Sequence, residues 1–362
     1  MVYLASIAFI FALLQLANAT VNLVFYQRLI PAKYELNDLV SILIPTRNEE
    51  KNIGTLLASL QEIKYQHVEI LVYDDQSTDR TAAIVNEWAA SDQRIRLIHP
   101  KQLKPGWLGK NHACHNMAQE ARGAYLLFID ADVVLSGNIV EDAVHTLKKQ
   151  KLGLLSFFPR QLILSSGEKV SVPIMNYILL TLLPLIFVRH SPFSAHAAAN
   201  GQFMLFSASI YNKFNPHLTF KDSPVEDISI AQHFKKNKIK VSCMLGDKQV
   251  TCRMYSSYRE ALNGFSKNVL MFFGNQTLLA ILFWALTTLG FIFIASISLK
   301  LFFLYTALII LTRVIVSIIS RQHIMSNILF IIPQHVFLLH VISNAIMIKR
   351  KKNYTWKERK IY

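Results

Sequence analysis

Charged side chains are scarce in this chain. Asp, Glu, Lys and Arg make up 17% of the 362 residues, whereas an ordinary soluble domain holds roughly 25%. Acidic residues are scarcest near the C-terminus, because none follows Glu260 until Glu358. Together with 52% hydrophobic residues, this composition excludes an intrinsically disordered chain and argues against a protein that is soluble throughout.

Cysteine is also rare. Cys114, Cys243 and Cys252 form neither a Cys-x-x-Cys pair nor a Cys/His spacing typical of zinc ligands. This excludes a disulfide framework, and we expect three reduced thiols in a cytosolic domain.

What the chain does have is long uncharged runs at both ends. Asp, Glu, Lys and Arg are absent, apart from Arg313, from four runs: residues 2–25, 277–299, 301–320 and 324–348. Each run approaches the ~20 residues that cross a bilayer core as a helix. The sequence therefore predicts four parts: a transmembrane anchor over residues 1–27, a hydrophilic domain over 36–270, transmembrane helices over 275–348, and a basic tail over 349–362.

The first run is expected to be an uncleaved anchor. It lacks the basic n-region of a signal peptide, and it is longer than a usual h-region. Arg28 and Lys33 follow it, whereas no charged side chain precedes it. Because basic flanks usually face the cytoplasm, we expect a multi-pass protein of the cell membrane with a cytoplasmic catalytic domain.

The basic tail is expected in the cytoplasm too. Residues 349–362 hold seven Lys and Arg against Glu358 alone, and they supply part of the formal net charge of +15. Basic residues beside a membrane helix favour anionic lipid, so we expect no nucleic-acid partner. A domain and a tail on one side require an even number of crossings between them. Pro333 in the last run predicts that this run is broken or re-entrant.

One more uncharged stretch, residues 170–188, contains Pro173 and Pro184. A crossing here would place the two halves of the hydrophilic domain on opposite sides of the membrane. We therefore expect an amphipathic helix that lies on the bilayer surface.

The hydrophilic region alternates predicted strands and helices. Apolar runs typical of buried parallel strands lie at residues 40–45, 68–73, 95–99 and 124–129. Helical spacing occurs between them, at residues 49–61, 77–88 and 111–121, and Asn48 and Asp79 are the expected N-terminal caps of the first two helices. This order predicts an α/β fold with a mostly parallel sheet, whose ligands bind at the carboxyl ends of the strands.

Acidic residues follow two of these strands. Asp74 and Asp75 come after the second strand, and Asp130 and Asp132 come after the fourth. Turn residues would explain the first pair. Two carboxylates placed side by side by an apolar strand, however, repel each other unless a cation neutralises them. Oxygen ligands suit Mg²⁺ or Mn²⁺ bridging to a diphosphate, so the second pair predicts a metal site.

Four motifs occur in the order found in the family 2 glycosyltransferases, which the chain resembles over roughly residues 38–270. They are Ile44–Glu50 (IPTRNEE), Asp74–Thr81 (DDQSTDRT), Asp130–Asp132 (DAD) and Val225–Asp227 (VED). One departure is Gln76, where the family usually has Gly or Asn. The resemblance implies a GT-A nucleotide-diphospho-sugar transferase fold and transfer of the sugar with inversion.

Finer motifs resemble the membrane-bound terpenoid glycosyltransferases, which include the diaponeurosporenoate (carotenoid) and hopanoid-associated glycosyltransferases. They are residues 105–114 (PGWLGKNHAC), 253–255 (RMY) and 356–359 (WKER). The Gln-x-x-Arg-Trp motif of processive polysaccharide synthases is absent, which argues against polymer synthesis. The resemblance implies a UDP-sugar donor, with glucose as the expected sugar, and a lipid acceptor that is a terpenoid or carotenoid acid or alcohol.

The resemblance assigns donor binding to seven residues: Thr46, Glu49, Asp74, Asp75, Lys110, Asp130 and Arg253. Carboxylates such as Asp75 would accept from the N–H and hydroxyl donors of uracil and ribose. Lys110 and Arg253 would contact the phosphates. A surface lysine at a helix start is the alternative for Lys110.

Asp227 is the expected catalytic base, with Glu226 beside it, and a charge at a helix N-terminus is the alternative for Asp227. A carboxylic acid acceptor would be ionised at neutral pH, and Asp227 would then orient it. Asp132, with Asp130, would bind the metal. The expected acceptor side comprises Trp107, His196, Asn200 and Gly201. A packing role is the alternative for Trp107, and His196 is expected to be a hydrogen-bonding loop residue rather than a metal ligand.

Three rival functions remain. A transferase acting on polyprenyl phosphate or on a glycerolipid would carry the same motifs. A non-catalytic membrane scaffold with a transferase-like fold would be expected to lack the acids, yet Asp75, Asp130, Asp132 and Asp227 are all present. A nucleic-acid-binding protein would need a basic stripe interleaved with aromatic residues, and this occurs nowhere outside the tail.

Overall fold

The computed structural model describes residues 1–32, 36–351, 355–356 and 359–360. Lys33 and Glu358, used above to orient the chain, lie outside the described residues. By packing, the chain divides into two units. The first comprises residues 1–26, 161–186 and 253–362, and the second comprises residues 27–160 and 187–252. This division differs from the predicted domain at residues 36–270, because residues 161–186 and 253–270 pack with the apolar helices.

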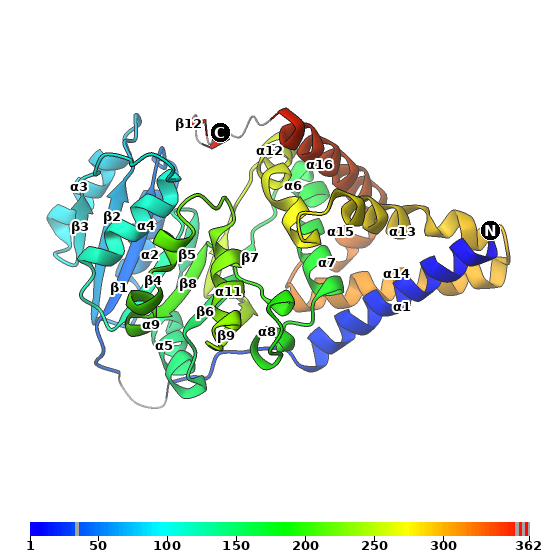
Figure 1. Ribbon diagram of the computed structural model, residues 1–362, viewed down its shortest axis with the longest axis horizontal. Coiled ribbons are helices and arrows are strands. Elements are labelled where there is room, and N and C mark those ends of the chain that lie inside the picture. Colours follow the sequence, from blue (N-terminus) through cyan, green and yellow to red (C-terminus); the bar gives the residue numbers. More distant parts are fainter. Residues whose placement is uncertain (33–35, 352–354, 357–358, 361–362) are drawn as a thin grey trace. The chain divides into compact units, whose positions relative to one another are not determined.

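The second unit is built on a seven-stranded sheet in the order β3-β2-β1-β4-β8-β6-β9 (Figure 1). The strands are β1 Val40–Thr46, β2 Val68–Asp74, β3 Ile95–Ile98, β4 Tyr125–Ile129, β6 Leu154–Phe158, β8 Phe203–Ser207 and β9 Val241–Leu245. Strand β8 runs antiparallel to β4 and β6, whereas the other four pairings are parallel. The predicted α/β fold with a mostly parallel sheet is therefore confirmed.

Burial explains the composition of the central strands. The side chains of Val40, Ile42, Leu43 and Ile44 in β1 are fully buried, as expected for a parallel strand covered on both faces. In the parallel register Thr46 lies opposite Asp74. The carboxyl ends of β1 and β2 thus bring the first two acidic motifs side by side.

Helices and short strands connect this sheet. They are α2 Ile53–Gln61, α3 Thr81–Ser91, α4 Gly109–Glu120, β5 Val133–Leu135, α5 Ile139–Gln150, β7 Arg160–Gln161, α8 Ile186–His190, the 3₁₀ turn η1 Ser194–His196, α9 Ala208–Phe214, α10 Pro216–Thr219, α11 Glu226–Lys236 and β10 Val250–Cys252. Strands β5 and β10 pair antiparallel. Three predicted helices are present, with starts shifted by two to four residues.

Neither expected residue is the N-cap of its helix. Asp79 accepts a hydrogen bond from the backbone N–H of Thr81 (3.0 Å), but the N-cap of α3 is Arg80, whose side chain makes no cap hydrogen bond. Asn48 does not cap a helix, because α2 begins only after Asn52. The side-chain oxygen of Asn48 instead accepts from the N–H of Thr78 (2.9 Å), which joins the first two motifs.

The first unit is helical. Its elements are α1 Val2–Val24, α6 Ser166–Ser171, α7 Pro173–Leu182, α12 Tyr258–Asn268, η2 Val269–Phe273, α13 Thr277–Ala295, α14 Leu299–Ile319, α15 Ile324–Leu329, α16 Ile331–Lys351, and the short strands β11 Thr355–Trp356 and β12 Arg359–Lys360. Among the residues that the structure describes, α1, α13, α14 and α16 are long and apolar enough to cross a membrane. The first three uncharged runs each form one long helix, whereas the last run, residues 324–348, is broken into α15 and α16.

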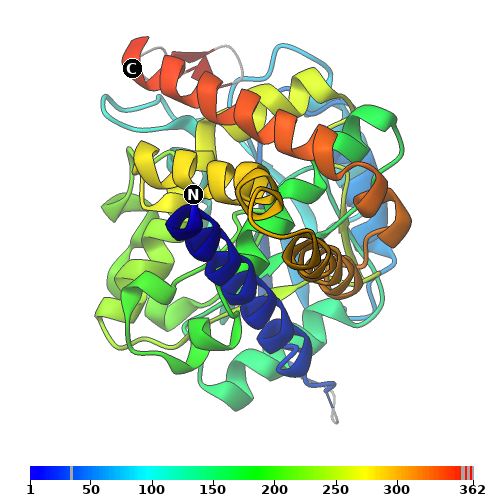
Figure 2. The same cartoon turned by 90° about the vertical axis from the view of Figure 1, so that its right-hand side faces the viewer.

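Helices α1, α13 and α14 lie side by side (Figure 2). A Cβ atom on Gly290 would lie 2.4 Å from the Tyr305 hydroxyl and 3.0 Å from Cβ of Ala8. Small residues at the contact let membrane helices approach closely. The Tyr305 hydroxyl also donates to the carbonyl of Leu286 (3.2 Å), which satisfies a polar group in an apolar contact.

Residues 170–188 do not form the expected surface helix. Helix α7 packs against α1, α14 and α16, and seven of its ten residues are buried. Its end before Pro184 is held by Asn22 of α1, whose amide donates to the carbonyls of Leu180 and Leu183 (3.0 Å each). Buried backbone groups that a helix end leaves unpaired need such a partner inside an apolar bundle.

Candidate active site

The first two motifs form one rigid pair of loops after β1 and β2. The N–H of Asp75 donates to the carbonyl of Thr46 (2.8 Å), and the N–H of Asn48 donates to the Ser77 hydroxyl (2.9 Å). Gln76 has a φ of +57°, in the left-handed region that favours Gly and Asn. This explains why the family usually has a small residue there and shows that Gln76 preserves the turn.

The four acidic and polar residues of these loops have different surroundings. The Asp74 carboxylate accepts from both the N–H and the hydroxyl of Ser77, so it stabilises the turn. Asp75 is buried. The Thr46 hydroxyl donates to the carbonyl of Tyr73 (3.1 Å). Glu49 accepts from the Asn52 amide (2.8 Å) at the start of α2.

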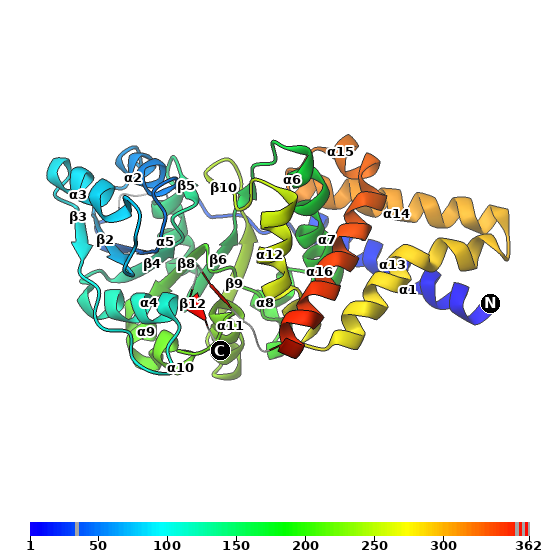
Figure 3. The same ribbon diagram turned by 90° about the horizontal axis from the view of Figure 1, so that it is seen from above.

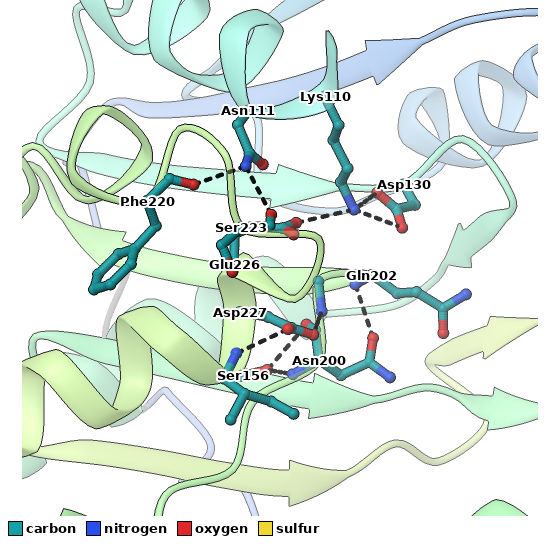
Figure 4. A network of polar contacts seen from close by, with 12 residues as sticks. Lys110, Asn111, Asp130, Ser156, Asn200, Gln202, Phe220, Ser223, Glu226 and Asp227 are labelled. Atoms are coloured by element: carbon teal, nitrogen blue, oxygen red, sulfur yellow. Dashed lines mark hydrogen bonds and ion pairs between the residues drawn. The ribbon is translucent and has the colours of Figure 1, made fainter. Parts of the chain in front are cut away.

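Lys110 lies at the centre of an acidic cluster (Figure 4). Its Nζ atom is 2.8 Å from Asp130 Oδ1 and 3.5 Å from Glu226 Oε1. Burial by itself would lower the pKa of Lys110, but Asp130 and Glu226 hold this pKa well above its usual value. The lysine therefore stays cationic, and it is not the surface residue considered as its alternative.

Glu226 and Asp227 begin α11, which points its N-terminus at this cluster. Asp227 Oδ2 accepts from the N–H of Gly201 (2.9 Å), and its Oδ1 accepts from the N–H of Ile228 (2.8 Å). Burial raises the pKa of Asp227. Burial also raises the pKa of Glu226 to about 7, where Lys110 opposes the shift and Asp227 adds to it. A carboxylate oriented by two backbone donors, with a raised pKa, suits a general base.

The turn at residues 200–202 faces Asp227. The N–H of Asn200 donates to the Ser156 hydroxyl (2.8 Å), and the Asn200 side-chain oxygen accepts from the N–H of Gln202 (2.8 Å). These bonds fix Gly201 between the charged groups. A Cβ atom on Gly201 would lie 3.1 Å from Lys110 Nζ, 3.4 Å from Glu226 Oε1 and 3.7 Å from Asp227 Oδ2.

We expect Gly201→Ala to lower the initial rate by less than about 100-fold, because the new Cβ would displace Lys110 Nζ by a few tenths of an ångström, whereas a misplacement of about 1 Å costs about 10²-fold. The measurement is the initial rate of the purified protein, with its unfolding temperature as the check on folding. Gly54→Ala is the matched control, since its new Cβ would meet only Ile84 at an ordinary 3.7 Å. Equal rates in both variants would show that the space at Gly201 is not used.

Asp132 belongs to a second polar group. Gln202 Nε2 donates to both Asp132 oxygens (3.3 and 3.2 Å) and to the Cys252 sulfur (2.9 Å). Burial and the neighbouring Asp130 raise the pKa of Asp132 to about 6. The Gln202 side-chain oxygen is buried and has no hydrogen-bond partner among the described residues.

This donor set fits a divalent cation. Asp130 and Asp132 offer carboxylate oxygens, and the accumulated negative charge at Asp132 would be relieved by a positive ion. No group of three or more His, Cys, Asp and Glu side chains suited to a metal occurs within the described ranges. The protein would thus supply two carboxylates and leave the remaining positions to substrate phosphates and water, as is usual for Mg²⁺.

Three predicted residues have other partners. His196 Nδ1 lies 2.7 Å from the Ser191 hydroxyl, and its ring stacks on Phe187. Trp107 packs against the rings of His112 and His115. Arg253 belongs to the first unit, where its Nε donates to Glu168 (2.8 Å). Their predicted contacts with donor or acceptor stay predictions.

Two polar residues to which the motifs assigned no role hold the cluster in place. The Asn111 amide donates to the carbonyls of Phe220, Lys221 and Ser223 (2.9, 3.3 and 3.0 Å), so it ties the start of α4 to the loop before α11. Lys235 on α11 donates to the carbonyls of Val188, Phe187 and His196 (2.7, 3.1 and 3.4 Å). The position of Asn111 directly after Lys110 is a sequence signal. The partners of Asn111 and Lys235 are backbone carbonyls, however, and a backbone carbonyl cannot be recognised from the type of its residue.

Known proteins are similar to this chain in sequence or in fold. Residues 41–171 match the family model described as Glycosyl transferase family 2. The 4,4'-diaponeurosporenoate glycosyltransferase of Staphylococcus haemolyticus (strain JCSC1435) is 28% identical over 238 residues, which are 65% of this chain and 62% of that protein. The protein of the same name from Staphylococcus aureus (strain USA300) is 28% identical over 271 residues, 72% of this chain and 69% of its own.

A solved structure extends the likeness of the fold. The mannosyltransferase from Pyrobaculum calidifontis in complex with GDP-Man and Mn²⁺ has a TM-score of 0.59 at 16% identity, covering 95% of this chain and 99% of its own. The aligned region spans less than two thirds of the S. haemolyticus relative. The family match covers residues 41–171, the two relatives are 28% identical, and the solved structure shares the fold, so the chain resembles the family 2 glycosyltransferases and its catalytic unit has a fold of the GT-A type.

Proposed function

We propose that this protein is a membrane-bound inverting glycosyltransferase that moves glucose from UDP-glucose to a terpenoid acceptor, an acid or alcohol of the carotenoid type. The observation that carries the proposal is Asp227, oriented by the N–H groups of Gly201 and Ile228 beside the Lys110 cation. The names of the two Staphylococcus relatives support the class of acceptor.

The reaction is a single displacement. The acceptor oxygen attacks the anomeric carbon, and the new C–O bond forms as the bond to the diphosphate oxygen breaks and its electron pair leaves with the diphosphate. A hydroxyl acceptor gives its proton to Asp227, whereas a carboxylate acceptor carries none at neutral pH and is only oriented there. Lys110, held cationic by Asp130 and Glu226, would meet the charge that develops on the diphosphate.

Donor recognition is proposed for the loops after β1 and β2. Asp75 would accept from uracil or ribose, with Thr46 and Glu49 beside the nucleotide and Asp74 holding the turn. Arg253 is proposed to pair with the diphosphate, in exchange for part of its contact with Glu168.

Asp132, with Asp130, is proposed to hold Mn²⁺ or Mg²⁺. When bound, the cation would neutralise charge on the donor diphosphate. Gln202 orients Asp132 through its amide, and its unpaired side-chain oxygen is a further oxygen donor on the same side chain. Oxygen donors of this kind are those that both ions prefer.

The acceptor is proposed to come from the bilayer. A terpenoid is nearly insoluble in water, so the reaction has to take place at a membrane surface. Asn200 and Gly201 would border the acceptor, together with Trp107 and His196. The basic flank at Arg28 supports a multi-pass arrangement in the cell membrane with the catalytic unit in the cytoplasm.

Lipid mass spectrometry of cells tests this function. Cells that make the wild-type protein are expected to accumulate a hexosylated terpenoid acid or alcohol, and cells that make Asp227→Asn at the same level are not. A hexosyl polyprenyl phosphate or hexosyl diacylglycerol in its place would overturn the proposed acceptor. Identical lipids in both strains would favour the non-catalytic scaffold.

A further inference from the structure

The last uncharged run can be placed in depth by its hydrogen bonds to the α13–α14 hairpin. The connection at residues 296–298 is the tip of this hairpin, and the end where α13 begins and α14 finishes is its base. Helix α1 runs alongside with Ala8 near Gly290 on the tip side. Its C-terminal end therefore lies toward the base, and from there the chain continues into the catalytic unit.

The run leaves α14 at the base. The Asn327 amide of α15 donates to the Ser317 hydroxyl (2.9 Å), and Ser317 lies two residues before the end of α14. Helix α15 therefore starts at the level where α14 finishes.

The start of α16 lies deeper. Arg313 donates to the Gln334 side-chain oxygen (2.8 Å), and the Trp284 indole N–H donates to the carbonyl of His335 (3.0 Å). Arg313 is six residues before the end of α14, and Trp284 is seven residues after the start of α13. At 1.5 Å per residue both lie about 10 Å from the base, with the tip about 16 Å beyond Trp284.

The other end of α16 returns to the base. Lys349 Nζ donates to the carbonyl of Asn275 (3.2 Å), two residues before α13 begins. A crossing helix would rise about 21 Å over the fourteen residues from His335 to Lys349. The partners of these two residues, Trp284 and Asn275, differ in depth by only about 13 Å, and Asn275, the partner of the later residue, lies nearer the base. Figure 3 shows α16 running crosswise to α13 and α14.

The neighbour of α16 is a charged helix, which supports a place for α16 at the edge of the membrane. Helix α12 contains Arg259, Glu260 and Lys267, which would be costly in a bilayer core. The Asn344 amide of α16 donates to the Ser266 hydroxyl of α12 (3.0 Å). Helix α16 thus packs along a charged helix for much of its length.

We infer that α16 does not cross the membrane but is a re-entrant helix, which enters the bilayer from the base side and leaves on that side. Its inner polar groups, Gln334, His335 and Asn344, are hydrogen-bonded within the unit, as buried non-spanning segments require. Its outer face meets the acyl chains through four residues that are each at least 39% exposed: Ile332, Val336, Leu339 and Met347. Lys349 and Arg350 reach the anionic headgroups.

This arrangement gives three crossings, by α1, α13 and α14. Two of them separate the catalytic unit from the C-terminal tail, so both lie on one side of the membrane. The number of crossings between the catalytic unit and the basic tail is thus even, as a cytoplasmic position of both requires. The inference depends on hydrogen bonds within the helical unit and stands independently of the proposed sugar transfer.

Variants of the full chain that each carry one added cysteine, in sealed vesicles, test the topology. A membrane-impermeant maleimide is expected to label Arg350→Cys from the same side as Asp222→Cys of the catalytic unit, and Ile297→Cys at the hairpin tip only from the opposite side. Background is low because Cys114, Cys243 and Cys252 are buried. Labelling of Arg350→Cys from the Ile297 side would overturn the inference.

Depth measurement provides a second readout. A fluorophore on Leu339→Cys, in vesicles of phosphatidylglycerol and phosphatidylcholine, is expected to be quenched by shallow rather than by mid-bilayer quenchers. A label on α14, at Leu311→Cys, is the control for a crossing helix. Equal mid-bilayer quenching of both labels would contradict a re-entrant α16. Gel filtration and unfolding temperature establish that each variant is folded.

Discussion

Asp227→Asn is expected to lower the rate of sugar transfer to a hydroxyl acceptor by about 10²–10⁴-fold, the usual contribution of a general base. The amide keeps the size of the side chain and can still accept from the N–H of Gly201, which Asp227 now does at 2.9 Å. It cannot take a proton. Initial rates at saturating donor, with the unfolding temperature as a check, measure this loss.

The matched control is Asp222→Asn, which removes one acidic charge from the exposed loop before α11. Its rate should equal that of the wild type. The rates of Asp227→Asn and Asp222→Asn also distinguish the two acceptor classes. A carboxylate acceptor needs no proton removal, so with such an acceptor the rate loss in Asp227→Asn would be smaller. A full rate in Asp227→Asn with a hydroxyl acceptor would disprove the assignment of the base.

Asp132→Ala is expected to abolish activity at ordinary metal concentrations and to make the protein more stable. Removal of groups that only support a metal ligand costs about 10–100-fold in affinity or activity, so loss of the ligand itself should cost more. The readouts are the rate and its dependence on Mn²⁺ concentration.

The gain in stability follows from the pKa of Asp132. Burial and Asp130 raise it from 3.8 to about 6, so the folded state holds this proton more tightly than the unfolded state. The wild type then loses stability as pH rises from about 4 to 6, and the variant does not. In metal-free buffer at pH 7 the variant should unfold at the higher temperature. Activity of Asp132→Ala that is retained at low Mn²⁺ would contradict the proposed metal site.

The sequence predicted the catalytic unit well where local patterns are strong. Continuous apolar runs identified four strands, and acids after two of them identified the edge of the sheet that carries the site. Strands β6, β8 and β9 escaped this reasoning. Strand β8 lies between β4 and β6 in the sheet and pairs antiparallel with both, and these pairings join residues far apart in the chain. Without β8, the turn of Asn200 and Gly201 could not be placed opposite Asp227.

Side-chain partners were predicted less well than positions. Lys110 was expected on a phosphate, and its ion pair with Asp130 became visible only in the structure. The helix expected from residue 49 starts at Ile53, since the preceding residues bond to the second motif instead, as the N–H of Glu49 does to the Thr81 hydroxyl (2.8 Å). Such bonds depend on the meeting of two loops, which no single segment encodes.

Lys235 has a consequence for motion during the reaction. It sits on the helix that begins with Glu226 and Asp227, and it grips the backbone at Phe187, Val188 and His196. Each hydrogen bond from a charged donor contributes about 1.5–3 kcal/mol. Residues 187–196 and α11 are therefore expected to move as one body. An incoming lipid acceptor that displaces residues 187–196 would therefore displace Asp227 as well. The acceptor and the base would then keep their positions relative to each other.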